Sequence, residues 1–257
     1  VIKMFVSLKY YLYFFFYNNI VMVKYKHRIA DRILERKVLG KGAVLIEGPK
    51  WCGKTTTAKQ LSKSILDLGD SSVLMQSSQL IEISPKALLE GKTPRLIDEW
   101  QALPTIWDCI RSEVDRRGEP SQFILTGSSV LPEAEETIHS GTGRFAYIKM
   151  RTMSLYESGE STGSISLSDL FEGKSFEVLQ NEMDIDELAY LICRGGWPWA
   201  TLIPKEVALD QAFDYVDSVV QKDIQRVDKI KRSPDRARLL LRSYARNISQ
   251  QISYATI

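Results

Sequence analysis

Short apolar runs alternate with amphipathic stretches along the first part of the chain. Runs of about four to eight mostly apolar residues between polar or glycine-rich segments are typical of buried strands. Five segments fit or approach this pattern: Ala43–Glu47, Ser72–Met75, Leu96–Asp98, Gln122–Ser129 and Phe145–Met150.

Three of the intervening stretches have the features of helices. Arg28–Val38 carries its aliphatic side chains on one stripe, Thr56–Asp67 follows a glycine-rich turn, and Pro104–Arg117 ends at Gly118. All three are therefore predicted to be helical. Strands that alternate with helices favour an α/β fold, with a parallel sheet flanked by helices.

The segment Gly48–Thr55 matches G-x-x-x-x-G-K-[ST], the phosphate-binding loop of P-loop nucleotide triphosphatases. Backbone N–H groups of such a loop form a nest for anions, and the following helix adds the positive end of its dipole. Lys54 is expected to reach the β- and γ-phosphates, and the Thr55 hydroxyl to bind Mg²⁺. The predicted nucleotide-binding residues are Gly48, Pro49, Lys50, Trp51, Cys52, Gly53, Lys54, Thr55 and Thr56.

Two acidic residues, Asp98 and Glu99, stand at the end of the predicted strand Leu96–Asp98. Asp98 is expected to hold Mg²⁺ through a water, because Mg²⁺ keeps several waters and takes only one or two carboxylates in proteins. Glu99 is placed to polarise the attacking water as a general base. The alternative interpretation of this pair is an exposed acidic turn after a strand.

Hydroxyl and guanidinium groups further along the chain are additional candidates. Thr126 and Ser128 end the next predicted strand, at the sheet edge where ligands of open α/β sheets bind. They would sense the γ-phosphate or position water, unless they only cap a turn. Arg144 would stabilise transition-state charge in its own subunit or in a neighbour, unless it is a surface arginine in a turn. The predicted catalytic residues are thus Lys54, Glu99, Thr126, Ser128 and Arg144.

Taken together, these motifs and their neighbours resemble the predicted AAA+-superfamily ATPases of archaea and bacteria that carry a poorly characterised C-terminal domain. Three segments make the resemblance specific, namely Tyr25–Lys37, His139–Arg144 and Met153–Ser161. It implies an AAA+-like parallel sheet that binds ATP, followed by an incomplete α-helical, winged-helix-like region. Other matching segments are Leu45–Thr57, Pro94–Pro104, Gln122–Ser128 and Arg194–Pro198. Members of this group continue well beyond the C-terminal residue of this chain, so a truncated protein is expected.

Composition divides the chain into four expected parts. Residues 1–23 form an apolar extension, 24–156 the P-loop ATPase domain, 157–185 an acidic, serine-rich linker or lid, and 186–257 the start of a helical C-terminal domain. Within the third part only Leu167–Phe171 is predicted to be helical. Further helices are predicted at Leu188–Cys193, Val207–Val220 and Arg236–Ala245.

The N-terminal extension is rich in aromatic and aliphatic residues, but it is shorter and more interrupted than the roughly 20 apolar residues of a membrane span. We therefore expect no stable membrane span, with an interfacial anchor as the alternative. A further hypothesis is that Met22 is the natural start and that the residues before it are translated upstream sequence. N-terminal peptide mass spectrometry on native protein would contradict this by detecting residues 1–21.

Overall charge and cysteine content change this interpretation little. The net charge of +2 does not indicate a nucleic-acid binder, although Lys222–Arg242 holds eight basic and three acidic side chains. That stretch could contact DNA phosphates or form a solvated helix face. Three widely spaced cysteines show no disulfide or zinc spacing, which fits a cytoplasmic protein.

The predicted function is Mg²⁺-dependent ATP hydrolysis that drives a conformational switch of the attached C-terminal domain. A homo-oligomer, and a DNA or protein partner of the helical region, are possible. One alternative is a nucleotide-gated DNA- or protein-binding module with little turnover, and another is a P-loop kinase. The Asp98–Glu99 pair favours water as the acceptor. The choice between ATP and GTP stays open in the sequence.

Overall fold

Residues 25–127, 141–176, 183–224 and 233–253 are described by the computed structural model. Five parallel strands form one sheet with the order β2-β3-β4-β1-β5. The parallel α/β sheet predicted from the sequence is thereby confirmed. The strands are β1 (Ala43–Glu47), β2 (Ser64–Asp67), β3 (Arg95–Asp98), β4 (Phe123–Gly127) and β5 (Phe145–Lys149).

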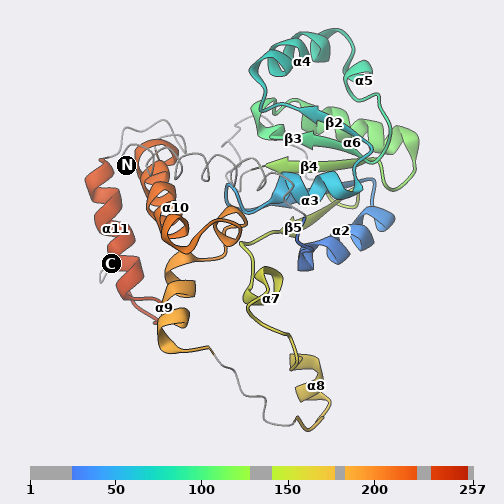
Figure 1. The fold of residues 1–257 in the computed structure, drawn as a ribbon. Coiled ribbons are helices and arrows are strands. Elements are labelled where there is room, and N and C mark those ends of the chain that lie inside the picture. Colours follow the sequence, from blue (N-terminus) through green and yellow to red (C-terminus); the bar gives the residue numbers. More distant parts are fainter. Residues whose placement is uncertain (1–24, 128–140, 177–182, 225–232, 254–257) are drawn as a thin grey trace, which may run out of the picture.

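Helices cover both faces of the sheet (Figure 1). Along β1, Ala43 and Leu45 pack into one apolar cluster, whereas Val44 and Ile46 pack into the other. All four side chains are at most 1% exposed, as expected for a central strand between two helical layers. One layer holds α2 (Ile29–Gly40) and α3 (Lys54–Leu61), and the other holds α4 (Ser71–Ile83), α5 (Pro85–Leu88) and α6 (Ile106–Arg117).

The strand order determines which residues meet at the carboxyl edge of the sheet. β4 lies between β1 and β3, with Thr126 of β4 opposite Ile46 of β1. Because all of these strands are parallel, the loop after β1 and the residue Asp98 at the end of β3 emerge on either side of Thr126. Ligands of open parallel sheets bind at this edge.

Two sequence-based predictions near α3 are wrong. The helix after the glycine loop stops at Leu61, and Ser64–Asp67 forms strand β2 rather than the end of that helix. Ser72–Met75, predicted to be a strand, lies in α4. The local reason for the second error is a cap: the Asp70 carboxylate accepts hydrogen bonds from the backbone N–H groups of Ser72 and Val73 and so starts the helix.

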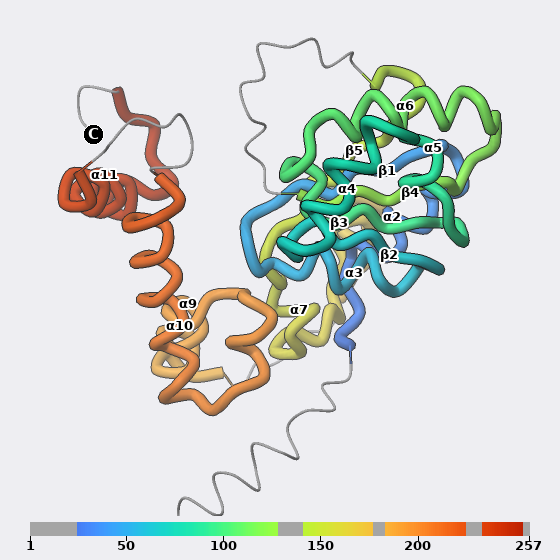
Figure 2. Tube along the Cα trace, turned by 90° about the horizontal axis from the view of Figure 1, so that it is seen from above, coloured from blue at the N-terminus to red at the C-terminus, as the bar shows by residue number. Residues whose placement is uncertain are grey.

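Helices make up the regular structure after the sheet. The predicted helix at Leu167–Phe171 is confirmed as α8, and three later ones as α9 (Ile185–Arg194), α10 (Lys205–Ser218) and α11 (Pro234–Arg246). A short helix α7 (Leu155–Ser158) comes before them, and a π-helical turn, η3 (Val219–Asp223), continues α10. No strand follows Lys149 in the described residues, and the winged-helix-like arrangement stays a prediction. Seen from above, α9–α11 lie beside the sheet and its helices, with α7 on the side toward them (Figure 2).

Some predictions fall outside the described residues. These are the N-terminal extension, Ser128, His139 and part of the basic stretch 222–242. Within the ranges that are described, no helix has the length and apolar character needed to cross a membrane.

Strand β2 can be tested with two neighbouring residues. Leu66 is 8% exposed and belongs to the core, whereas Ile65 is 45% exposed. We expect Leu66→Ala to lower the free energy of unfolding by about 2–5 kcal/mol, because it leaves a cavity in the core. Ile65→Ala should cost less than about 1 kcal/mol. Urea unfolding followed by circular dichroism measures both, and equal losses would contradict the observed strand.

Candidate active site

The loop between β1 and α3 depends on two glycines. A Cβ on Gly48 would lie 2.2 Å from the Met150 carbonyl oxygen, so a side chain does not fit there. Gly53 is the N-cap of α3 and has φ of 100°, a left-handed conformation that glycine adopts readily. The loop therefore has the close packing and the positive φ that a compact phosphate-binding turn requires.

Lys54 is the first residue of α3 and is only 6% exposed. Its ammonium group donates hydrogen bonds to the carbonyl oxygens of Gly48 and Pro49, both at 3.0 Å. The side chain thus folds back over the loop and places a positive charge beside it. Together with the N-terminus of α3, this charge makes the loop suitable for an anion.

The Asp98 carboxylate connects the ends of the strands. Its Oδ1 accepts a hydrogen bond from the Thr55 hydroxyl at 2.9 Å and another from the Thr126 hydroxyl. Asp98 is 7% exposed and Thr126 is fully buried. A carboxylate and a hydroxyl in contact form an all-oxygen set of the kind that Mg²⁺ prefers. Thr55 and Asp98 therefore fit the predicted metal site. No group of three or more His, Cys, Asp or Glu able to hold a metal occurs in the described part of the chain.

Glu99 has an unusual backbone conformation. Its φ of 53° and ψ of 43° lie in the left-handed region, which non-glycine residues seldom adopt and which is enriched at functional sites. The side chain is half-buried, and the Gln101 amide donates a hydrogen bond to its Oε2. Gln101 was not singled out in the sequence, where nothing distinguishes it from other polar residues after a strand.

The exposed residues of the loop have different surroundings. Trp51 is 70% exposed and has a positive φ of 63°. Lys50 forms an ion pair with Asp223 of η3 at 2.5 Å, so the helical region reaches the loop. Thr56 is exposed on the first turn of α3.

The structure does not bring Arg144 to this site, which corrects the expectation that it could act within its own subunit. Arg144 comes just before β5, at the amino edge of the sheet, where its carbonyl oxygen accepts a hydrogen bond from Ala43 N. The length of β1, about 16 Å for five residues, separates it from the loop. The guanidinium instead pairs with Asp115 of α6 at 2.6 Å.

Cys52, in the middle of the loop, is not an accessible thiol. It is fully buried, and its Sγ lies 3.9 Å from the Met150 carbonyl oxygen. Burial raises the pKa of the thiol, so little reactive thiolate is present. Alkylation of Cys52 in the folded protein is therefore disfavoured.

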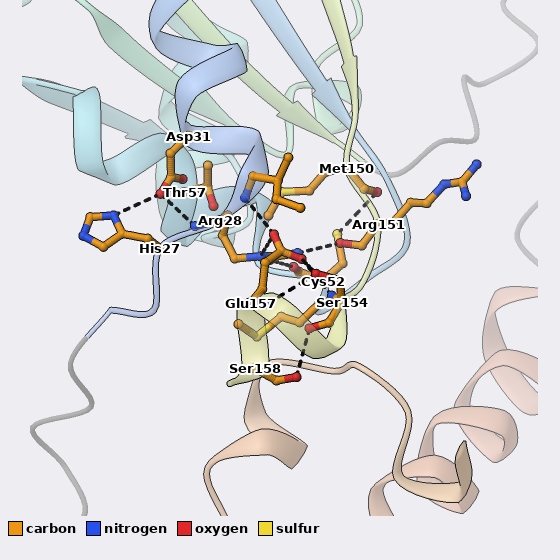
Figure 3. A network of polar contacts seen from close by, with 12 residues as sticks. His27, Arg28, Asp31, Cys52, Thr57, Met150, Arg151, Ser154, Glu157 and Ser158 are labelled. Carbon is orange, nitrogen blue, oxygen red and sulfur yellow. Dashed lines mark hydrogen bonds and ion pairs between the residues drawn. The ribbon is translucent and has the colours of Figure 1, made fainter. Parts of the chain in front are cut away.

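A buried polar network, missed in the sequence, lies behind the loop (Figure 3). Arg28, at the N-terminus of α2, is 7% exposed and pairs with Glu157 of α7 at 2.9 Å. Burial acts to raise the pKa of Glu157, but hydrogen bonds from Ser154 N, Ile29 N and Arg28 outweigh it and hold this pKa below its usual value. Glu157 thus packs against the sheet domain, although a linker was expected to begin there.

Two family models match the chain. Residues 40–159 match a family described as AAA domain, and residues 185–257 match a domain of unknown function, DUF8612. Two relatives are 27% identical over 138 residues: the uncharacterized proteins Mb2031c of Mycobacterium bovis and Rv2008c of Mycobacterium tuberculosis. The matched stretch spans 53% of this chain and 31% of each relative.

Two solved structures are similar to this chain at lower sequence identity. The FIGL-1 AAA domain in complex with ADP is 12% identical, with a TM-score of 0.36 over 90% of this chain and 85% of that one. PCH-2 of C. elegans is 18% identical, with a TM-score of 0.29 over 82% of this chain and 56% of that one. Residues 40–159, which hold the parallel sheet and its glycine loop, are thus similar to an AAA domain.

Proposed function

We propose that this protein binds ATP with Mg²⁺ and hydrolyses it. The observation that carries the proposal is the meeting of the ends of β3 and β4 with the start of α3 at Asp98, where Thr55 of α3 and Thr126 of β4 both bond one carboxylate oxygen. A strand-end carboxylate beside a P-loop hydroxyl is the arrangement used to hold the metal of a bound nucleotide.

Each residue would have a separate role. The loop N–H groups and the Lys54 ammonium would bind the phosphates, and Thr55 and Asp98 would hold Mg²⁺. The ion would neutralise charge that develops on the phosphate oxygens. Thr126 lies between the loop and Asp98, where its hydroxyl can orient the carboxylate or a water.

Glu99 would act as the general base toward the attacking water. The carboxylate accepts a hydrogen bond from Gln101, which fixes its orientation. The strained backbone at Glu99 is consistent with a position held for chemistry rather than for stability.

The hydrolysis would be coupled to the helical C-terminal region as a conformational switch. The contact that supports this is the ion pair between Lys50 of the loop and Asp223 of η3. The same contact also favours a second candidate, a nucleotide-gated binding module in which ATP binding alone moves the helices. Phosphate-release kinetics with and without DNA distinguish the two, because a gated module releases phosphate at a negligible rate.

Lys54→Ala should abolish nucleotide binding, because it removes the buried positive charge beside the loop. We expect the affinity for ATP to fall at least about a hundredfold in isothermal titration calorimetry, given that a desolvated charged contact contributes several kcal/mol. Lys59→Ala, an exposed lysine on the same helix, is the matched control and should bind normally. Equal affinities of Lys54→Ala and the wild type would end the P-loop hypothesis.

Glu99→Gln should keep ATP binding and lose turnover, since the amide is isosteric but cannot accept the proton from water. A general base contributes roughly 10²–10⁴-fold to the rate, so phosphate release should slow by about that factor. Glu90→Gln, an exposed residue after α5, serves as the control for carboxylate removal. Undiminished phosphate release by Glu99→Gln would assign the base elsewhere.

Arg144 can contribute only if a second copy presents it to the site. Its present partner, Asp115, is exposed and could release it to such a site. We therefore expect Arg144→Ala and Glu99→Gln proteins to be inactive separately and to regain phosphate release when mixed, because one mixed interface pairs an intact base with an intact arginine. Full activity of Arg144→Ala alone would show that the residue is a surface arginine of the amino edge.

A further inference from the structure

The Arg28 guanidinium contacts the glycine loop from behind, through the Cys52 carbonyl oxygen. Its Nη1 donates to the Cys52 carbonyl oxygen at 2.7 Å, and its Nη2 donates to the Arg151 carbonyl oxygen at 2.9 Å. Its Nε donates to Glu157 Oε1 at 2.9 Å. One buried cation thus joins the loop, the chain after β5 and α7, as Figure 3 shows.

The bond to Cys52 fixes the orientation of one peptide group. The Cys52–Gly53 peptide is trans, since the cis peptide in the described residues is Thr93–Pro94. In a trans peptide the C=O and N–H groups point in opposite directions. Because the Cys52 carbonyl points to Arg28, the Gly53 N–H points away from it. An anion nest needs N–H groups that turn away from the protein behind the loop, and Gly53 is the N-cap of α3.

The guanidinium is itself held in place from several sides. Glu157 accepts from Arg28 and from Ile29 N, and its other oxygen accepts from Ser154 N at 2.7 Å. The backbone N–H of Arg28 bonds Asp31 Oδ2 at 2.9 Å. A planar guanidinium can serve two carbonyls and one carboxylate at fixed angles, whereas a lysine ammonium of similar reach cannot.

We propose that Arg28 is a positioning residue that aims the Gly53 N–H at a bound phosphate by holding the Cys52 carbonyl from behind. This inference rests on the proposed function, because it assigns a role within the same nucleotide site. Arg28 does not itself touch the phosphates in this arrangement; it acts through the peptide group.

The chain contains a matched control for a buried arginine. Arg194 of α9 is 4% exposed and pairs with Glu160, just after α7, at 2.6 Å. Its Nε bonds the Gly195 carbonyl oxygen rather than the loop. Loss of Arg194 therefore removes a similar buried ion pair without releasing the Cys52 carbonyl.

The experiment compares wild type, Arg28→Lys, Arg28→Met and Arg194→Met. Affinity for ADP is measured by calorimetry, and the amide signal of Gly53 is followed by NMR during the titration. We expect both Arg28 variants to bind ADP about tenfold more weakly, the effect of one misdirected hydrogen bond, and to show a smaller Gly53 shift. Arg194→Met should keep the wild-type affinity and shift even if its melting temperature falls equally.

Two results would overturn the inference. One is ADP affinity and a Gly53 shift in Arg28→Lys that equal those of the wild type. The other is an equal loss of affinity in Arg194→Met, which would show only a general effect of a lost ion pair. Arg28→Lys keeps the positive charge opposite Glu157. If Arg28→Met does not fold, the ADP affinity and the Gly53 shift of Arg28→Lys alone decide the question. Failure of the wild type to bind ADP or ATP would overturn the proposed function, and this inference with it.

Discussion

Strand β1 is the constraint on which the rest of the arrangement depends. It is hydrogen-bonded on one side to β4 and on the other to β5, and its side chains fill both apolar clusters. A strand fixed on both edges and both faces cannot shift when a charged ligand binds beyond its end. The loop that leaves it is held in turn by the Met150 backbone, which lies too close to Gly48 to allow a side chain. The geometry of the loop is thus set by the core.

Two buried arginine–carboxylate pairs extend this rigidity beyond the sheet. Glu157 of α7 and Glu160, just after α7, bond Arg28 and Arg194, respectively. Removing one partner of such a pair typically costs about 3–5 kcal/mol, because the other charge stays buried. Burial acts to raise the pKa of both carboxyls, but their hydrogen bonds keep each pKa below its usual value. Their contribution to stability is therefore complete above the ordinary glutamate pKa and is lost as the pH falls below it.

The sequence predicted those features that follow from local pattern. The bounds of β1, the glycine-containing loop motif and the carboxylate at the end of β3 are all encoded within a few neighbouring residues. The boundary between α3 and β2 was mispredicted because Ile65 and Leu66 fit a helix and a short strand equally well until the sheet provides β3 as a partner. Arg28 could not be identified, since its three acceptors lie far along the chain or on the backbone. Arg144 was misplaced for a related reason: the spacing of a motif does not show at which edge of a sheet it emerges.

The contacts between the loop and the helical region differ in strength, and this difference suggests where movement is easiest. Lys50 and Asp223 are 44% and 29% exposed, and an ion pair of this kind contributes about 0–1 kcal/mol. The nearby Trp197 and Tyr215 rings, 4.2 Å apart, hold the turn after α9 against α10. A displacement of α10 and η3 from the loop breaks the weak Lys50 pair and disturbs the Trp197–Tyr215 contact, whereas a displacement at α7 breaks a buried ion pair. The α7 end is therefore the more firmly held side of this junction, and the Lys50 end is the more weakly held side.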